Sequence, residues 1–219
     1  ITDESDELQG LITIKDIADA NMELLDTGVL AAANTPLTNL LETLDAELLV
    51  GDKDARITKG NICIGTSPEI MEELVKPGDL VLVSNRYETQ MCAIDCGAAA
   101  LIVCCGSAVP RTIVARAKEK GCYILTTPYD TYAASRLVTT AAPVRHFMRT
   151  NRLLKFSVNT PVEDAQKVMA SVRHRYFPIL DQNGKYCGVI SRRNLLNMHR
   201  KRVILVDHNE KSQAVDGLA

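Results

Sequence analysis

The stretch GVISRRN, from Gly188 to Asn194, has a counterpart near the other end of the chain, where GLITIKD runs from Gly10 to Asp16. The two stretches share the glycine, a hydroxyl residue at the fourth position and an Asp or Asn at the seventh. Each begins as an apolar run and continues into helical spacing, so each predicts a strand that ends where a helix begins. One supersecondary unit therefore occurs twice in this chain.

The second copy lies in residues 144–202, which begin with a basic stretch and then predict the order strand, helix, strand, strand, helix. Asn159 and Thr160 are expected to cap the first helix, over residues 161–174. The apolar runs YFPIL and YCGVIS flank the pair Asn183-Gly184, a pair that is typical of tight hairpins. Residues 144–202 therefore form a small domain of their own.

The first copy lies in residues 1–30, which read as an acidic turn, a short strand LITI and a helix with a loose apolar pattern. A strand and one helix cannot bury both of their faces. This segment is therefore expected to be the C-terminal half of an incomplete domain that packs on another part of the chain, or on residues before Ile1.

The middle segment, residues 35–140, alternates apolar strands with amphipathic helices. Strands that are apolar on both faces and are separated by helices predict an α/β domain with a mainly parallel sheet covered on both sides. Ser67 and Pro68 mark one helix start, Pro110 marks another, and Gly97 and Gly121 mark helix ends. The expected strands are ELLVG, NICIG, DLVLVSN, AALIVCCG and YILTT.

Composition excludes several classes of protein. The 219 residues include 25 basic and 27 acidic side chains, and a net charge of −2 argues against a nucleic-acid-binding surface. No apolar run approaches the length of a membrane span, and the acidic N-terminal stretch is unlike a signal peptide. We therefore expect a cytoplasmic protein with neither a nucleic-acid nor a membrane partner.

The seven cysteines lie in apolar stretches and are expected to be buried thiols rather than disulfides. Cys92 and Cys96 on a predicted helix, with Cys104 and Cys105 at a strand end, leave a metal site as the alternative. A cysteine enzyme with Cys104 or Cys105 as nucleophile is a further alternative, although no histidine is near either residue in sequence.

The repeated unit carries the candidate site. A hydroxyl at a helix N-terminus, here Thr13 and Ser191, suits a phosphate, because free backbone N–H groups and the positive end of the helix dipole lie beside it. A carboxylate or amide one turn later, Asp16 or Asn194, can reach ribose hydroxyls. Neighbouring basic and aromatic side chains can clamp phosphates and stack on adenine, namely Lys15, Arg173, Arg175, Tyr176, Arg192 and Arg193. The alternative is that the hydroxyls are helix caps and the cations a solvated helix end.

The motif from Gly188 to Asn194 resembles that of the CBS domain, a β-α-β-β-α module that pairs into a Bateman module. The resemblance implies that the two copies, residues 1–30 and 144–202, bind an adenine nucleotide between them. Asn194 stands where the family more often has Asp.

Residues 35–140 resemble the DRTGG domain. The similarity rests on Arg86, on LIVCCGS at residues 101–107 and on TTPYDTYAASRLV at residues 126–138. It implies a spacer or dimerisation unit, in which Tyr129 and Asp130 cap a helix and Arg86 is structural or interfacial. The family's glycine-rich loop is reduced to one glycine here, which disfavours a phosphate cradle.

The stretch VILVDHNEKSQAVDG, residues 203–217, is similar to the family II inorganic pyrophosphatases, some of which carry a CBS, DRTGG and CBS insert ahead of this motif. The resemblance implies that Asp207 is a ligand of Mn²⁺ or Mg²⁺ in a longer parent enzyme, since a hard carboxylate suits these ions. The other metal-binding motifs are absent, so we expect this chain alone to be catalytically inactive.

The same resemblance implies regulation of the parent pyrophosphatase, with inhibition by AMP or ADP, activation by ATP or diadenosine polyphosphates, and a homodimer formed through the CBS and DRTGG domains. The alternative is a CBS and DRTGG sensor of nucleotides or other metabolites attached to a different effector domain.

Overall fold

The computed structural model describes residues 1–22 and 26–196. The chain divides into two compact units, one formed by Ile1–Thr13 with Met148–Ala219 and the other by Ile14–Phe147. Among the described residues, no helix is both long and apolar enough to span a lipid bilayer.

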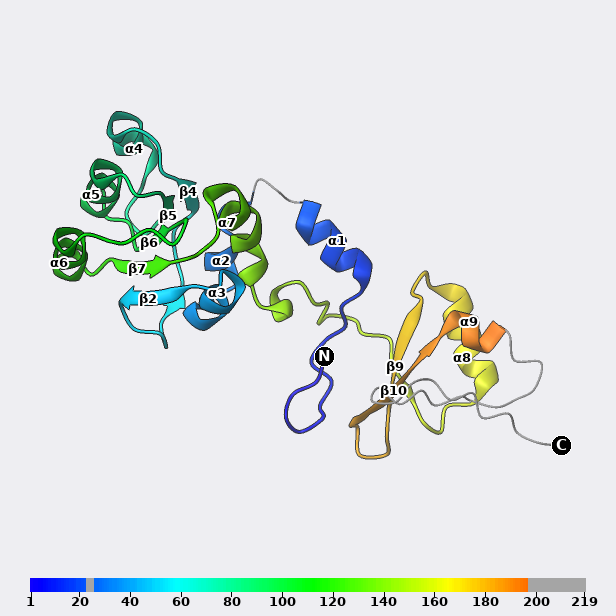
Figure 1. Ribbon diagram of the computed structural model, residues 1–219. Coiled ribbons are helices and arrows are strands. Elements are labelled where there is room, and N and C mark those ends of the chain that lie inside the picture. The colour runs from blue at the N-terminus through cyan, green and yellow to red at the C-terminus, as the bar shows by residue number, and fades with distance from the viewer. Residues whose placement is uncertain (23–25, 197–219) are drawn as a thin grey trace. The chain divides into compact units, whose positions relative to one another are not determined.

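The larger unit is built on a five-stranded sheet with the order β2-β7-β6-β5-β4 (Figure 1). The four strands β4 to β7 are parallel, and β2 pairs antiparallel with β7 at the edge. The expectation of an α/β domain with a mainly parallel sheet is therefore confirmed. The strands are β2 (Glu47–Val50), β4 (Ile62–Ile64), β5 (Leu80–Val83), β6 (Ala100–Val103) and β7 (Tyr123–Thr126).

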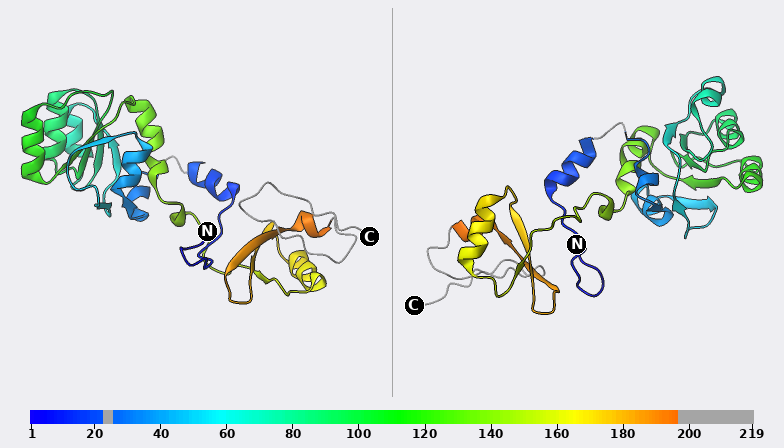
Figure 2. Two further views of the ribbon diagram at one scale, coloured as in Figure 1. Left: turned by 60° about the horizontal axis from the view of Figure 1, so that its bottom comes forward. Right: turned by 180° about the vertical axis from the view of Figure 1, so that it is seen from behind.

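Helices cover both faces of this sheet, and Figure 2 separates the two helical layers. One face is covered by α4 (Pro68–Leu74), α5 (Tyr87–Asp95) and α6 (Arg111–Lys120), whose apolar side chains share a core with Val81, Leu101 and Ile124. The other face is covered by α2 (Val29–Ala32), α3 (Leu37–Thr43), α7 (Thr131–Leu137) and the 3₁₀ helix η1 (Val138–Ala141). Because both faces are buried, the strands are continuously apolar, as their sequence shows.

Shorter elements complete the larger unit. They are helix α1 (Ile14–Met22), the strand pair β1 (Thr35–Pro36) and β3 (Arg56–Ile57), and the 3₁₀ helix η2 (Val144–His146). The five predicted strands are confirmed, and so are the predicted helices that follow the second, third, fourth and fifth of these strands. Helices α2 and α3 and the β1-β3 pair were not predicted. Helix α2 has four residues and the β1-β3 pair two residues per strand, too short for a periodic pattern to stand out. Helix α3 is as long as α4 and α7, but its N-cap residue is Pro36, whereas theirs are Ser67 and Asp130, which signal a helix start.

The helix ends follow the expected signals in most cases. Ser67 is the N-cap residue of α4 with Pro68 at its start, and Gly121 closes α6 in the left-handed conformation, with φ of 69°. Pro110 was expected to be the first helical residue of α6, but it is the N-cap residue, and the helix begins at Arg111. At Gly121 a side chain would be strained by the left-handed backbone, although an added Cβ atom would have no neighbour within 4 Å.

The smaller unit has a three-stranded sheet with the order β10-β9-β8 and two helices. Strand β8 (Phe156–Ser157) runs parallel to β9 (Tyr176–Leu180), and β9 forms an antiparallel hairpin with β10 (Tyr186–Ser191). Helices α8 (Val162–Ser171) and α9 (Arg192–Leu196) complete the predicted order of strand, helix, strand, strand, helix. Its core contains Ala165, Met169, Phe177, Ile179 and Ile190.

One local prediction in this unit needs correction, and another is confirmed. Pro161, not Asn159 or Thr160, is the N-cap residue of α8, and the Thr160 hydroxyl instead accepts a hydrogen bond from the backbone N–H of Ser157 at 3.0 Å. The hairpin after β9 forms as predicted, and only Gly184 of the Asn-Gly pair has a positive φ. Asp181 closes the turn by accepting from the N–H groups of Asn183 and Lys185, at 2.8 Å each.

The N-terminal segment packs on the hairpin side of the smaller unit. Glu7 pairs with Lys185 in an antiparallel bridge, and Leu11 pairs with Arg149 in another. The predicted strand LITI is reduced to this one bridge at Leu11, and α1 already begins at Ile14. A strand needs a partner along its length, and the pairing with Arg149 supplies one at a single residue.

Candidate functional site

The end of the β9-β10 hairpin brings several predicted site residues together. Ser191, the last residue of β10, lies opposite Tyr176, the first residue of β9. The backbone N–H of Arg192 donates to the carbonyl oxygen of Arg175 at 3.0 Å. The hairpin thus places Arg175, Tyr176, Ser191 and Arg192 at one edge, although they are about 16 residues apart in sequence.

Ser191 and Asn194 contact each other at the start of α9. The Ser191 hydroxyl donates to Oδ1 of Asn194 at 2.5 Å, and the backbone N–H of Asn194 donates back to that hydroxyl at 3.2 Å. This is the geometry of a helix cap, in which a side-chain oxygen accepts from an N–H of the first turn. The hydroxyl therefore lies at a helix N-terminus, as predicted, and already has a structural role there.

Arg192 points toward the end of α8. Its guanidinium Nη2 donates to the carbonyl oxygens of Met169 and Val172, where α8 ends. The last carbonyls of a helix have no partner within the helix, so a cation at this place satisfies them and complements the dipole. Its Nε is buried and has no hydrogen-bond partner in residues 1–22 and 26–196. Arg192 was predicted to clamp phosphate, and its described contacts instead join α8 to α9.

Other predicted basic and aromatic side chains are open to solvent. Arg173, Arg175 and Arg193 are exposed, and Tyr176 is 48% exposed. Arg173 and Arg175 lie in the segment that connects α8 to β9, and Arg193 lies in the first turn of α9. Their cationic groups and the tyrosine ring are available to a phosphate and a base, while their role as ligand contacts remains a prediction.

The first copy of the motif lies at the start of α1. Thr13 directly precedes this helix, and Asp16 lies in its first turn, so the order matches that of Ser191, α9 and Asn194. Lys15 is exposed, and Thr13 and Asp16 are partly buried. Lys15 and Asp16 belong to the larger compact unit, whereas Thr13 belongs to the smaller one.

In the larger unit, the residues that were read as structural have structural contacts. Asp130 is the N-cap residue of α7, and its side chain accepts from the Ala133 N–H at 2.7 Å, as predicted. The N–H groups of Cys105 and Gly106 donate to the carbonyl oxygens of Tyr129 and Thr127, at 2.7 and 2.8 Å. Because these two N–H groups are already bonded, the loop after β6 does not offer them to an anion.

The thiols of Cys92 and Cys122 are protonated near neutral pH. Burial raises the pKa of Cys122 to about 12 and, with the neighbouring Cys96, that of Cys92 to about 11. Cys92 and Cys96 lie with their Sγ atoms 3.9 Å apart. Within residues 1–22 and 26–196, no group of three or more His, Cys, Asp or Glu side chains is arranged to hold a metal ion. Asp207, the predicted metal ligand, lies outside the described residues.

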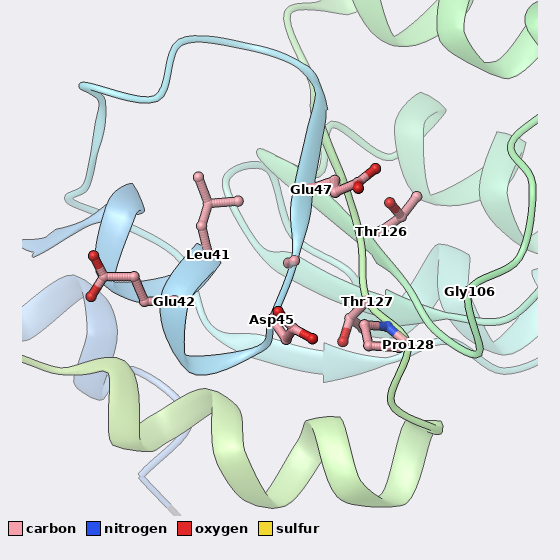
Figure 3. A pocket seen from close by; sticks show the side chains of 9 residues that line it. Leu41, Glu42, Asp45, Glu47, Gly106, Thr126, Thr127 and Pro128 are labelled. Atoms are coloured by element: carbon pink, nitrogen blue, oxygen red, sulfur yellow. The ribbon is translucent and has the colours of Figure 1, made fainter.

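A cavity that the sequence analysis missed lies at the edge of the larger sheet. Its volume is about 550 Å³, and Figure 3 shows the side chains around it. It was missed because the helix at one side, α3, was not predicted. The lining residues are Leu41, Glu42, Asp45, Ala46, Glu47, Gly106, Thr126, Thr127 and Pro128.

Known proteins resemble both units. The family models for the DRTGG domain and the CBS domain match residues 39–141 and 144–201. The chain is 32% identical over 219 residues to the cobalt-dependent inorganic pyrophosphatase of Clostridium perfringens, covering all of this chain and 40% of that protein. It is 27% identical over 214 residues to a probable manganese-dependent inorganic pyrophosphatase of Thermotoga maritima, covering 97% of this chain and 39% of that protein. The chain thus spans about two fifths of the curated relatives it matches.

A solved structure is similar over most of the chain. It contains the CBS and DRTGG domains of the regulatory region of the Clostridium perfringens pyrophosphatase, complexed with the activator diadenosine tetraphosphate. The TM-score is 0.80 at 29% sequence identity, and the match covers 88% of this chain and 84% of the other. The chain therefore contains a DRTGG domain and a CBS domain, and it is homologous to the regulatory region of the Clostridium perfringens inorganic pyrophosphatase.

Proposed function

We propose that this chain binds adenine nucleotides and regulates a pyrophosphatase that contains it. The observation that carries the proposal is the likeness to a regulatory region complexed with diadenosine tetraphosphate, at 29% identity over 88% of this chain. The curated relatives that share this region are inorganic pyrophosphatases, and they are longer than the chain. The chain by itself is not a pyrophosphatase in this proposal.

The nucleotide site uses the repeated motif. Ser191 and Thr13, each placed directly before a helix, receive a phosphate, because the helix dipole and the first N–H groups favour an anion there. Asn194 and Asp16 hydrogen-bond ribose hydroxyls. Exposed cations neutralise the remaining phosphates, and the half-exposed Tyr176 ring stacks on adenine. The cations are Lys15, Arg173, Arg175 and Arg193.

Arg192 has a different role in this proposal from the one first predicted. Its guanidinium is bonded to Met169 and Val172, so it fixes the end of α8 against α9. Arg173 and Arg175 follow directly from that helix end. Arg192 therefore positions the phosphate-binding segment rather than contacting the phosphate itself.

Regulation follows from differential binding. A ligand shifts a conformational equilibrium only by the difference between its affinities for the two states. AMP or ADP would stabilise an inhibited arrangement of paired CBS domains in a homodimer, and ATP or diadenosine polyphosphates an active one. In the longer enzyme, whose metal is a divalent ion such as cobalt, manganese or magnesium, Asp207 would be one ligand.

Calorimetric titration of the 219-residue chain with AMP, ADP, ATP and diadenosine tetraphosphate tests the binding proposal. A ligand at 100 times its dissociation constant stabilises the fold by about 2.7 kcal/mol, so a melting shift should accompany the heat. GMP is the control for the base, and Arg111→Ala, at an exposed arginine on α6, is the control for Arg175→Ala. The absence of binding of all four adenine nucleotides at millimolar concentration would overturn the proposal.

The regulatory part requires a longer enzyme that contains this region. Its pyrophosphate hydrolysis should fall with AMP or ADP and rise with ATP or diadenosine tetraphosphate, and Ser191→Ala should weaken both responses. Light scattering on the chain should give the mass of a dimer. Nucleotide binding without any effect on hydrolysis would favour the sensor of another effector domain instead.

A further inference from the structure

Two cysteines at the end of helix α5 lie side by side. The Sγ atoms of Cys92 and Cys96 are 3.9 Å apart. The metal site that the sequence left open also included Cys104 and Cys105, but no such group of three or more side chains forms in residues 1–22 and 26–196. The thiol of Cys104 is instead buried and donates to the carbonyl oxygen of Ile102. Cys92 and Cys96 are therefore a two-thiol cluster.

This cluster lies where helices α4 and α5 pack together on one face of the larger sheet (Figure 1). The Cys92 thiol donates to the carbonyl oxygen of Pro68, the first residue of α4, at 3.6 Å. Both cysteines pack against the core that contains Met71 and Ile94, and both are partly exposed. Packing thus holds the two side chains in place, and a small ion from solvent can still reach them.

The helical backbone prevents the two thiols from closing a disulfide. The N–H of Cys96 donates to the carbonyl oxygen of Cys92 at 2.9 Å, so the last helical turn is intact. Residues four apart on a helix have Cβ atoms about 5–6 Å apart, whereas a disulfide needs about 3.5–4.5 Å. Oxidation to a disulfide would therefore require this turn to unwind.

The separation of the sulfur atoms suits a metal ion that bridges them. Two metal–sulfur bonds of about 2.3 Å that meet at about 115° put their sulfur atoms about 3.9 Å apart. Thiolates select soft ions such as copper(I) and zinc(II). Structural zinc takes four protein ligands, and in the described part of the chain no third Cys, His, Asp or Glu side chain completes such a site. Two or three sulfur atoms satisfy copper(I), so the pair favours copper(I).

Negative charge near the pair favours a cation. Burial raises the pKa of the Cys92 thiol to about 11, with a smaller contribution from Cys96. The carboxylates of Glu72 and Asp95 add to the same shift, although Asp95 is also paired with Arg116 at 2.7 Å. A raised pKa disfavours a reactive cysteine, because the thiolate is the nucleophile. A cation that replaces the thiol protons instead gains from the nearby carboxylates.

We propose that Cys92 and Cys96 bind one copper(I) ion through their two thiolates. Binding breaks two S–H bonds, whose protons pass to the buffer, and forms two copper–sulfur bonds, and no electron is transferred. The bend at the ion leaves a third position, which a small thiol from solution can occupy. Neither cysteine belongs to the proposed nucleotide site, so either proposal can fail without the other.

Titration with copper(I), kept reduced by ascorbate and with bicinchoninate as the competing chelator, tests the proposal. The reference is the 219-residue chain with Cys105→Ser and Cys187→Ser, which lacks two exposed thiols outside the pair. It should bind one copper(I) per chain and show the ultraviolet charge-transfer band of a copper–thiolate bond. Adding Cys92→Ser and Cys96→Ser should weaken binding at least about a hundredfold, because losing even an outer-shell partner costs about 10–100-fold.

The matched control is Cys63→Ser in the same reference chain, because Cys63 is also a partly buried thiol. It should bind copper(I) unchanged, and circular dichroism should show the same fold for all variants. Alkylation of the unmodified chain needs no substitution at all. One equivalent of copper(I) should slow the reaction of Cys92 and Cys96 with iodoacetamide and leave Cys105 and Cys187 reactive, as peptide mass spectrometry can measure.

Two results would overturn the copper(I) site at the pair. One is equal copper(I) affinity of the reference chain and of the variant without Cys92 and Cys96. The other is protection of Cys105 and Cys187 from alkylation in place of the pair. Zinc(II) binding that depends on the pair as strongly as copper(I) binding does would overturn the choice of ion.

Discussion

The hydroxyl of Ser191 and the side chain of Asn194 are bonded to each other, with Oγ and Oδ1 2.5 Å apart. These are the two residues of the second copy that we expect to contact a nucleotide, and the Asn194 N–H also donates to the same hydroxyl. A nucleotide phosphate at this helix start would therefore compete with a contact that caps α9. The stability of the α9 start and the proposed nucleotide contact therefore both depend on the Ser191 hydroxyl oxygen.

Replacement of Ser191 tests both roles of its hydroxyl. Ser191→Ala should lower the free energy of unfolding by about 1 kcal/mol, the usual effect of losing an N-cap side chain. It should also weaken nucleotide binding, measured by calorimetry below the melting temperature of the variant. Ser191→Thr keeps the hydroxyl and should retain most of both properties. Ser171→Ala is the control at the end of α8, and a loss of nucleotide affinity as large as that of Ser191→Ala would contradict the assignment.

The adjacent Arg192 and Arg193 provide a matched pair. Arg192→Ala removes the contacts to Met169 and Val172 and should lower the free energy of unfolding of the smaller unit by about 2 kcal/mol, because hydrogen bonds from a charged donor are the stronger kind. Arg193 is exposed, so Arg193→Ala should change stability by less than about 0.5 kcal/mol. Chemical denaturation measures both values, and equal losses would contradict the role of Arg192.

Cys122 predicts how the larger unit responds to alkaline pH. Burial raises the pKa of this thiol from 9.0 to about 12. Folding therefore favours the neutral thiol. Below pH 9 the thiol is protonated in both the folded and the unfolded chain, so its contribution to the free energy of unfolding is complete. Above pH 9 the unfolded chain loses the proton first, so the melting temperature should decline until pH approaches 12.

Variants at cysteine positions identify the source of that decline. Cys122→Val removes the titrating group and should make the melting curve of the larger unit less dependent on pH between 9 and 11. Cys63, whose pKa burial and the nearby Asp79 raise to about 11, should account for part of the remaining decline. Cys105→Ala alters an exposed thiol and is the control. A pH profile unchanged by Cys122→Val would show that other groups dominate.

Gly10 is required by the packing of the N-terminal segment. A Cβ atom at this position would lie 2.6 Å from Sδ of Met148 and 3.0 Å from the carbonyl oxygen of Arg149. Gly10→Ala should therefore lower the free energy of unfolding by about 2 kcal/mol, as overpacking commonly does, and weaken the bridge between Leu11 and Arg149. Thermal denaturation and amide hydrogen exchange at Leu11 measure the two effects.

Gly184 is the comparison for this substitution. Its φ is 83°, and nothing lies within 4 Å of an added Cβ atom, so Gly184→Ala should cost only the backbone strain of about 1 kcal/mol. The double variant Gly10→Ala with Met148→Ala should recover part of the loss if the clash with the Met148 side chain is its main source. A milder effect at Gly10 than at Gly184 would contradict the packing explanation.

The sequence predicted the elements whose signals are local. Strands β9 and β10 were predicted with the bounds that the structure has, because two apolar runs flank a turn that carries Asp181 and Gly184. The parallel strands of the larger unit were predicted because each is apolar on both faces and is followed by a capped helix. The helix starts after Thr13 and Ser191 were predicted from the repeat, and the structure has both.

The sequence by itself determined the class of the fold, the presence of the repeated motif and the type of nearly every long element, since these depend on residues a few positions apart. Only the tertiary structure decided that β2 is antiparallel, that Glu7 pairs with Lys185, that Arg192 reaches the end of α8, and that α3, β2 and the segments after β6 and β7 line one cavity. Each of these contacts joins separate segments of the chain, and no periodic sequence pattern predicts which segments will meet. They depend on which surfaces remain to be buried or paired after the local elements have formed, and that is a property of the whole fold.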